Sequence, residues 1–374
     1  MEFKIPKNLF IKALAKTISI AEKNIGHVLS NILIEGDKDT ITFKSTDLEI
    51  ALIQQYPISL LKKGCVVVSA RKLYDIIKEF PDKDIDVAVD ERFKMELVSG
   101  KTRIRLNGIE PSEFPKIPEY KKDKFFKLET DSLLDMIEKT VFATSNNETK
   151  RILNGVYFEK IMREEKKFIR MIATDGHRLS IMDKEVENWN KINITEGVII
   201  PKKGLNELKR ICEDEASEVS FNFVDNNFVV IGDNTTLSMR LLQGGYPNYQ
   251  QVIPKRNENT MIVNRVELIN ALKRMSSICS LTDEFKKVLF TVEGSKLSLY
   301  SKSPELGEAN EEFDVEYIGM PLEVSFNSKF FIEALNVMNN AEKVRIKFGD
   351  KETPALLYYV NSAEYLHLIM PLRS

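Results

Sequence analysis

The one compact group of chemically active side chains in the sequence is segment 173–179, Ala-Thr-Asp-Gly-His-Arg-Leu. Asp175, two residues before His177, could form an acid–base pair or supply metal ligands. An Asp-Gly pair after the apolar run 168–172 is also typical of a tight turn. Catalysis would need a nucleophile or a further partner, and the sequence offers none beside this pair. We therefore interpret the segment as a turn.

Other catalytic or cofactor-binding motifs are missing from the sequence. It contains no Gly-rich phosphate loop, no dinucleotide fingerprint, no His-Glu-x-x-His and no paired cysteines. Cys65, Cys212 and Cys279 are far apart, so we expect no disulfide framework, metal site or cofactor, and a reducing cytoplasm. The chain begins directly with a predicted strand, so we expect no signal peptide. No apolar run reaches membrane-spanning length.

A strand followed by an amphipathic helix occurs three times, starting at Phe3, Phe126 and Met261. These starts are a whole domain apart. A second strand and helix recur in each copy, followed by alternating strands at 85–89, 219–223 and 344–348. Each copy is therefore predicted to be an α+β domain, with two helices on one face of antiparallel sheet. Segment 45–49, Ser-Thr-Asp-Leu-Glu, is the first copy's equivalent of the Asp-Gly turn and has no histidine.

The predicted domains are 1–124, 125–253 and 254–374, joined by proline-containing connectors at 111–118 and 244–254. The formal net charge is −2, yet basic residues gather on several predicted helices: Lys7, Lys12, Lys16 and Lys23; Arg71, Lys72 and Lys78; Lys202, Lys203, Lys209 and Arg210; Arg265, Lys273 and Arg274. One basic helix is ordinarily a solvated face. The recurrence equally indicates a row of helices facing an extended anion such as a nucleic-acid backbone. Both interpretations stay open.

The threefold domain, segment 173–179 and three short motifs together resemble the bacterial sliding clamp family, the beta subunits of DNA polymerase III. The motifs are Tyr-Pro-Asn-Tyr at 246–249, Val-Ile-Pro at 252–254 and Met-Pro-Leu-Arg at 370–373. The resemblance spans the whole chain. It implies a non-catalytic, head-to-tail homodimer that closes into a six-domain ring around double-stranded DNA. It also implies a cytoplasmic, nucleoid-associated protein that uses no cofactor.

The resemblance further implies partners that bind through short linear peptides: the DNA polymerase III alpha subunit, the clamp loader, other DNA polymerases and repair proteins. It assigns a peptide pocket to Leu153, Thr174, Gly176, His177, Arg178, Leu179, Pro247, Val252, Asn327, Phe330, Leu368, Ile369, Met370, Pro371, Leu372 and Arg373. Residues assigned to face DNA are Lys23, Arg71, Asn147, Lys150, Arg151 and Lys202. The dimer interface is assigned to Ile104, Leu106, Ile278 and Phe285.

Two residues depart from the family pattern. Gln251 replaces a basic residue, and Ser374 replaces an apolar one, so we expect altered preferences among partner peptides. The residues alone also allow two other classes of protein. An acid–base or metal-dependent enzyme would centre on Asp175 and His177. A sequence-specific DNA-binding regulator would need a recognition helix, and no helix-turn-helix or zinc pattern is present.

Overall fold

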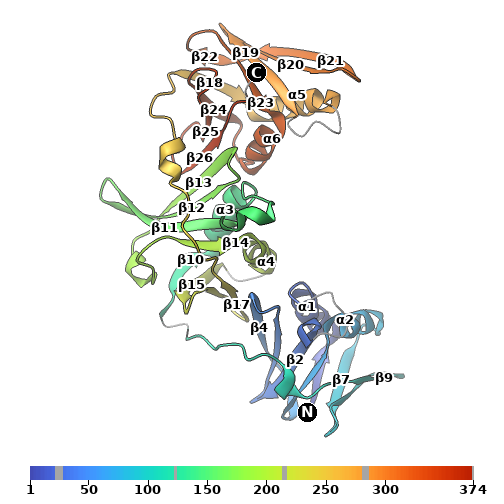
Figure 1. Ribbon diagram of the computed structural model, residues 1–374. Coiled ribbons are helices and arrows are strands. Elements are labelled where there is room, and N and C mark those ends of the chain that lie inside the picture. Colours follow the sequence, from blue (N-terminus) through green and yellow to red (C-terminus); the bar gives the residue numbers. More distant parts are fainter. Residues whose placement is uncertain (22–27, 122–123, 213–216, 280–285, 373–374) are drawn as a thin grey trace. The chain divides into compact units, whose positions relative to one another are not determined.

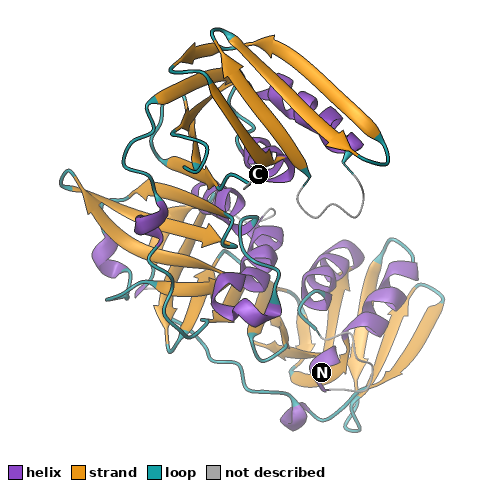
Figure 2. Cartoon of the chain, turned by 45° about the horizontal axis from the view of Figure 1, so that its top comes forward, coloured by secondary structure: helices purple, strands orange, loops and turns teal. Residues whose placement is uncertain are grey.

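The chain folds into two compact units, in which helices pack on antiparallel sheets (Figures 1 and 2). The computed structural model describes residues 1–21, 28–121, 124–212, 217–279 and 286–372. Unit 1 consists of residues 1–133, 190–194 and 203–241, and unit 2 of residues 134–189, 195–202 and 242–374. Both units contain strands from the central predicted domain. The predicted domain boundaries stay a prediction.

Unit 1 contains a five-stranded and an eight-stranded sheet. In spatial order the first is β5 (Leu60–Lys62), β1 (Glu2–Pro6), β7 (Asp84–Val89), β8 (Lys94–Ser99) and β9 (Thr102–Asn107). The second is β10 (Phe126–Glu129), β15 (Glu218–Val224), β16 (Asn227–Ile231), β17 (Thr235–Arg240), β4 (Ile50–Pro57), β3 (Thr40–Thr46), β2 (Asn31–Asp37) and β6 (Gly64–Ser69). Neighbouring strands pair antiparallel throughout.

Unit 2 contains a nine-stranded and a four-stranded sheet. The first is β14 (Val198–Pro201), β11 (Gly155–Arg163), β12 (Lys166–Thr174), β13 (Arg178–Glu185), β26 (Tyr365–Ile369), β25 (Ala355–Tyr359), β24 (Lys343–Phe348), β18 (Asn259–Asn264) and β22 (Glu316–Ile318). The second is β21 (Gly307–Asp314), β20 (Lys296–Ser303), β19 (Lys287–Glu293) and β23 (Leu322–Asn327).

Six α-helices lie in the described ranges: α1 (Lys7–Ile18), α2 (Ala70–Glu79), α3 (Thr130–Val141), α4 (Lys202–Cys212), α5 (Arg265–Ile278) and α6 (Ser328–Val337). Their apolar faces turn towards the sheets, and Phe10, Leu14 and Leu73 lie in one core with strand residues of unit 1. The Asn327 carboxamide oxygen accepts a hydrogen bond from the Lys329 amide at 3.0 Å, so Asn327 caps the start of α6. None of these helices is long and apolar enough to cross a membrane.

The order of elements repeats three times, which confirms the threefold α+β prediction. Each copy runs strand, helix, at least four strands, helix and three strands, with the first helices α1, α3 and α5 and the second helices α2, α4 and α6. Adjacent copies join edge to edge, because β4 of copy one pairs with β17 of copy two, and β13 of copy two pairs with β26 of copy three. We call the β4–β17 pairing the first junction and the β13–β26 pairing the second junction. The first lies in unit 1 and the second in unit 2.

One part of the basic-helix prediction is wrong. Lys16 of α1 is buried, and its ammonium group donates to the Ile211 carbonyl at 3.2 Å. It therefore satisfies a helix C-terminus instead of facing solvent, because a buried cation must find acceptors. Arg71 and Lys72 of α2 are exposed, as predicted.

Candidate functional site

Segment 174–178 is a turn between β12 and β13 that is held by its own side chains. The Thr174 hydroxyl donates to the Arg178 carbonyl at 2.5 Å and accepts from the Gly176 amide at 3.1 Å. One Asp175 oxygen accepts from the amides of His177 at 2.9 Å and Arg178 at 3.2 Å. Gly176 has a φ of +98°, a conformation that glycine adopts without a steric penalty. The predicted Asp-Gly turn is confirmed.

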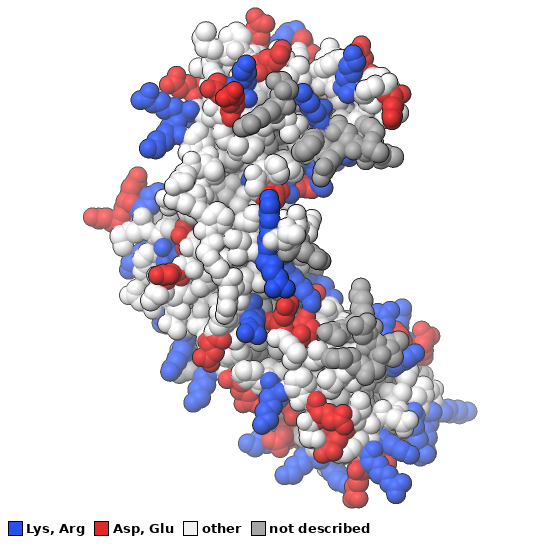
Figure 3. All heavy atoms as spheres, in the orientation of Figure 1, with Lys and Arg blue, Asp and Glu red and all other residues white. Residues whose placement is uncertain are grey.

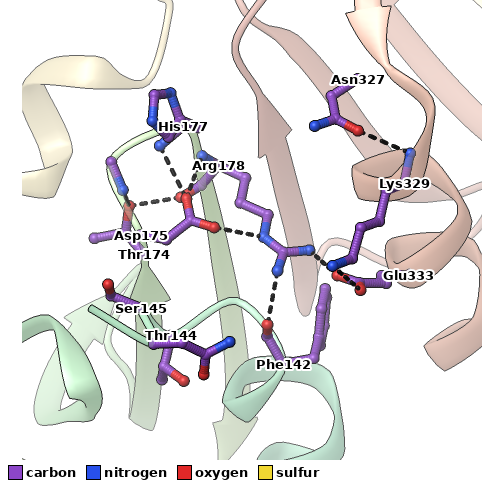
Figure 4. A network of polar contacts seen from close by, with 12 residues as sticks. Phe142, Thr144, Ser145, Thr174, Asp175, His177, Arg178, Asn327, Lys329 and Glu333 are labelled. Carbon is purple, nitrogen blue, oxygen red and sulfur yellow. Dashed lines mark hydrogen bonds and ion pairs between the residues drawn. The ribbon is translucent and has the colours of Figure 1, made fainter. Parts of the chain in front are cut away.

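Arg178 is the most highly connected side chain at this turn (Figure 4). Its Nε donates to Asp175 at 3.0 Å, its Nη2 donates to the Phe142 carbonyl at 2.8 Å, and its Nη1 bonds Glu333 of α6. The guanidinium carbon lies 4.6 Å from the centre of the Phe330 ring and 5.3 Å from that of Phe142. Only 6% of Arg178 is exposed. The side chain thus connects the turn, the end of α3 and a helix of copy three.

This arrangement is unsuited to acid–base chemistry. Both Asp175 oxygens accept bonds from the turn's backbone or from the guanidinium. The imidazole of His177 is exposed and points away from the guanidinium (Figure 4), so His177 is not a core histidine. No group of His, Cys, Asp and Glu side chains in the described ranges has the arrangement of a metal site. The local chemistry is that of recognition by an exposed ring, backbone groups and apolar side chains.

The end of the chain lies against this turn. Arg178 and Leu179 of β13 pair with Ile369 and Leu368 of β26. The Met370 amide then donates to the His177 carbonyl at 2.9 Å, and the Leu372 amide donates to the Ser325 carbonyl at 2.8 Å. Met370 is exposed, and Pro371 and Leu372 are half-buried. The residues after β26 therefore form a surface beside His177.

A hydrophobic face adjoins the turn on the β12–β13–β26–β25 part of the sheet. Its buried members are Ile172, Leu179, Ile181, Tyr249, Leu356 and Leu368, and Tyr157, Tyr246, Ile253, Tyr358 and Leu366 pack around them. We call these residues the hydrophobic face.

A half-buried ionic network anchors segment 246–253 to this face. Arg170 forms two bonds with Asp183, at 2.6 and 2.8 Å, and donates to the Tyr249 hydroxyl at 3.0 Å. The Tyr249 hydroxyl donates to Glu159. Burial by itself lowers the pKa of Arg170. The hydrogen bonds and the negative charge of Asp183 have the opposite effect and outweigh burial, so the pKa of Arg170 is raised above its ordinary value. Tyr246 stacks on Tyr157 with ring centres 4.8 Å apart, and burial raises the pKa of its phenol.

The structure brings the predicted pocket residues of its described part into one region of unit 2. Leu153, Arg178, Leu179, Asn327, Leu368 and Ile369 are buried; Thr174, Phe330, Pro371 and Leu372 are half-buried; Gly176, His177, Pro247, Val252 and Met370 are exposed. Asn327 is occupied as the cap of α6. Arg373 lies outside the described residues. Their role in peptide binding stays a prediction.

Four of the predicted DNA-facing residues lie in unit 2, and two of them, Lys150 and Lys202, lie near the turn. Asn147 caps the short helix η4 (Glu148–Asn154), in which Lys150 and Arg151 are exposed. The Lys150 ammonium lies beside Gly176: a Cβ atom added to this glycine would be 3.7 Å from it. Lys202 donates to the Asn146 side chain at 2.7 Å, and burial together with nearby Arg178 lowers its pKa.

The remaining predictions fall elsewhere in the chain. Arg71 is exposed on α2 of unit 1 and lies 3.4 Å from Asp75. Ile104 and Leu106 are half-buried on β9, and Ile278 is the half-buried last residue of α5. Lys23 and Phe285 lie outside the described residues. In Figure 3, positive and negative side chains are interspersed over the visible face.

Sequence reasoning missed Glu333 and Phe142, which hold Arg178. Glu333 is three residues after Phe330, so the two share one face of α6. That spacing could have indicated Glu333 once Phe330 was assigned. Phe142 contributes its backbone carbonyl, and a backbone contact of this kind leaves no pattern of side chains in the sequence.

Comparisons with known proteins agree along the whole chain. Family models of the DNA polymerase III beta subunit match residues 1–118 (N-terminal domain), 127–248 (central domain) and 250–373 (C-terminal domain). A beta sliding clamp of Staphylococcus aureus is 29% identical over 384 residues, covering 100% of both chains.

Solved structures agree as well. A sliding clamp from Bartonella birtlesii bound to griselimycin is 30% identical, with a TM-score of 0.93 over 100% of both chains. The Bacillus subtilis clamp is 26% identical, with a TM-score of 0.92 over 100% of this chain and 99% of that one.

The fold is a threefold repeat of helices on antiparallel sheet, and its candidate site is a hydrophobic sheet face beside a turn. These features define a protein that binds other molecules. The chain belongs to the DNA polymerase III beta subunit family, the bacterial sliding clamps. Its function is that of a DNA sliding clamp, a processivity factor instead of an enzyme. The enzyme and regulator interpretations of the sequence are therefore wrong.

Proposed function

We propose that two copies of the chain pair head to tail into a closed ring that encircles duplex DNA and slides without sequence preference. The observation that carries this proposal is a pair of strand edges. Within the described residues, β9 ends the five-stranded sheet and β21 ends the four-stranded sheet, each without a neighbour on its outer side. Their counterparts in the repeat are the strands that form the two junctions. An unpaired edge presents free backbone donors and acceptors to another strand.

The repeat also predicts the register of this contact. In both junctions the fifth residue of one strand faces the first residue of the other: Met239 faces Ile50, and Ile369 faces Arg178. The same rule places Leu106 of β9 opposite Gly307 of β21 in a second chain. Arg105 then faces Glu308, and Ile104 faces Ala309.

Charge complementarity supports the same pairing. β9 carries Arg103 and Arg105, whereas β21 carries Glu308, Glu311, Glu312 and Asp314. Opposite charges facing each other across an antiparallel pair are stabilising, and like charges are destabilising. Pairing of unlike edges is favoured over pairing of two β9 or two β21 edges.

A closed ring holds DNA by topology, so its phosphate contacts need only be loose. Lys23, Arg71, Asn147, Lys150, Arg151 and Lys202 supply these contacts in our proposal. Contacts of side chains with phosphates carry no sequence information, which suits sliding. DNA binding of this kind would place the protein in the nucleoid.

The hydrophobic face and the turn at 174–178 hold short peptides of the partner proteins. These partners are the DNA polymerase III alpha subunit, the clamp loader, other DNA polymerases and repair proteins. Beside the buried Leu179 and Leu368, the exposed side chains of Val252 and Met370 contact the peptide's apolar side chains. The flexible thioether of Met370 adapts to different partners. A tethered polymerase gains effective concentration at its template.

The test combines mass in solution with retention on circular and linear DNA after loading. We expect a dimer that stays on circles and leaves cut DNA. A monomer, or equal retention on both forms, would contradict the ring. Arg105→Glu should weaken the dimer, and adding Glu308→Arg should restore it if the two residues face each other. Lys94→Glu, which changes an exposed charge on the neighbouring strand β8, is the matched control.

A further inference from the structure

The hydrophobic face of unit 2 ends in two positive charges on β24. Residues that face each other across an antiparallel pair lie on the same side of the sheet. Arg345 faces Tyr358 and Lys347 faces Leu356 across the β24–β25 pair. Tyr358 in turn faces Leu366 of β26, and Leu356 faces Leu368. All four of these residues belong to the hydrophobic face. Two continuous rows therefore run from apolar side chains to cations.

A small pocket lies at the basic end of these rows. It has a volume of about 460 Å³ and is lined by Arg345, Lys347, Tyr358 and residues 360–363. None of these lining residues carries a negative charge. Arg345 is held in place by an Nη2 bond to the Val360 carbonyl at 2.7 Å. The Lys347 ammonium lies 6.0 Å from the centre of the Tyr358 ring.

The positive charges are particular to this copy. The strand equivalent to β24 in copy two is β15, where Ser220 faces Ile231 and Asn222 faces Val229 in the same two rows. Asn222 is buried, and its amide donates to the Lys124 carbonyl at 2.7 Å. The basic pocket is therefore not a requirement of the repeated fold. It accompanies the junction that carries the hydrophobic face.

We propose that this pocket binds the carboxylate of an acidic residue that flanks the apolar anchors of a partner peptide. The inference rests on the proposed peptide binding at the hydrophobic face. Adjacent strands are about 4.8 Å apart, so β24 lies roughly 10 Å across the sheet from β26. An extended peptide covers that distance in about three residues. The acidic residue belongs three to four positions from the anchors.

A peptide fits these charges better than a DNA backbone does. A duplex presents a regular series of phosphates and is bound by an extended array of cations. On the same face of β24, the next cation is Lys343, which is paired with Glu316 at 2.6 Å. Two cations at the end of an apolar row match one acidic side chain beside apolar anchors.

The experiment measures the affinity of the full-length protein for labelled nine-residue peptides. Each peptide has a central Leu-Leu-Phe, with Glu-Glu at one end or the other, and each has a Gln-Gln counterpart. We expect one Glu-Glu peptide to bind about twofold to fivefold more tightly than its counterpart at low salt. The advantage should shrink as salt rises.

Three variants assign the effect to residues. Lys347→Gln should remove most of the advantage, and Lys347→Glu should favour a Lys-Lys peptide instead. Lys343→Gln, on the same strand and face but already paired with Glu316, is the matched control and should leave the advantage unchanged. An equal loss in Lys343→Gln would overturn the assignment to this pocket.

The outcomes separate this inference from the proposed function. If the Gln-Gln peptides bind the wild type and the Glu-Glu peptides bind no better, the acidic subsite is wrong and the peptide site stands. If neither kind of peptide binds, the peptide site fails and the subsite fails with it. Weaker binding of short duplex DNA to Lys347→Gln, without any change for the peptides, would instead assign the pocket to DNA.

Discussion

The two junctions share a backbone and differ in their side chains. In the first junction, Thr46 and Asp47 make the same turn bonds as Thr174 and Asp175 make in the second. The Arg240 amide donates to the Glu49 carbonyl at 2.8 Å, as the Met370 amide does to His177. Asp47 pairs with Lys203, whereas Asp175 pairs with Arg178 of its own turn.

The faces beside the two turns differ much more. Where the second junction has Ile172, Leu179, Leu368 and Leu356, the first has Lys44, Ala51, Ser238 and Val229 at the equivalent positions in the pairing. The turn and its hydrogen bonds are therefore a common structural feature of both junctions. The apolar side chains on the adjoining sheet make the second junction a candidate peptide site. Substitutions that exchange residues between the junctions test this difference.

The largest effect is expected from Arg178→Ile, which introduces the residue found at position 50. It leaves Asp175 and Glu333 without their shared cation in a mostly buried place, which costs about 3–5 kcal/mol. Urea unfolding followed by circular dichroism should show a lower midpoint. Adding Glu333→Gln should recover part of the loss, and a wild-type midpoint in Arg178→Ile would contradict the role of the guanidinium.

The next effect concerns ligand binding. Leu179→Ala, which copies Ala51, leaves a cavity in the buried layer of the hydrophobic face and should weaken the Leu-Leu-Phe peptides about tenfold. Fluorescence anisotropy with the labelled peptides measures this. Leu237→Ala, a buried leucine in the first junction, is the control for general destabilisation, and an equal loss of affinity there would remove the distinction between junctions.

A smaller effect is expected at His367, whose counterpart in the first junction is Leu237. His367 is fully buried beside Phe142, and neither ring nitrogen has a hydrogen-bond partner in the described part of the chain. Burial, and next the charge of Arg178, hold its pKa well below the ordinary value. His367→Leu should therefore raise stability by about 1–3 kcal/mol.

The pH dependence of the same variant gives an independent check. Below about pH 6.5 the histidine binds a proton in the unfolded chain but not in the folded one, so acid lowers stability in that window. Thermal melts at pH 8 and pH 5.5 should show a smaller acid-induced drop in His367→Leu than in the wild type. An equal drop would mean that this histidine is not the group that titrates.

The smallest effect is expected at the tips of the turns. Leu48 has a φ of +73° and is 64% exposed, whereas its counterpart is Gly176. Leu48→Gly relieves the strain of the left-handed conformation but adds flexibility to the unfolded chain, so we expect a gain of about 0.5–1 kcal/mol. Gly176→Leu should lose about 1 kcal/mol. Urea midpoints of the two variants should shift in opposite directions.

Local features were predictable from the sequence because a few neighbouring residues determine them. The Asp-Gly turn and the Asn327 cap depend on side chains that bond amides two or three residues away. The threefold repeat was visible because each copy keeps its apolar periodicity. The basic periodicity of α1 could not reveal that Lys16 is buried, since burial depends on the distant end of α4.

The candidate site was predictable only in part for the same reason. The partner of Arg178 on α6 is 155 residues away in the chain. The hydrophobic face combines strands from two copies, and only the register of β13 with β26 places Leu179 beside Leu368.

Within the described residues β9 and β21 are unpaired edges, and in our proposal they make the chain a self-complementary building block. A contact between unlike edges has a direction, and repeated addition forms a closed ring or a filament, depending on the rotation at each step. The geometry of the two junctions therefore controls the size of the assembly as well as its stability. A substitution far from either open edge, such as one that bends a junction, could turn a finite oligomer into a fibre.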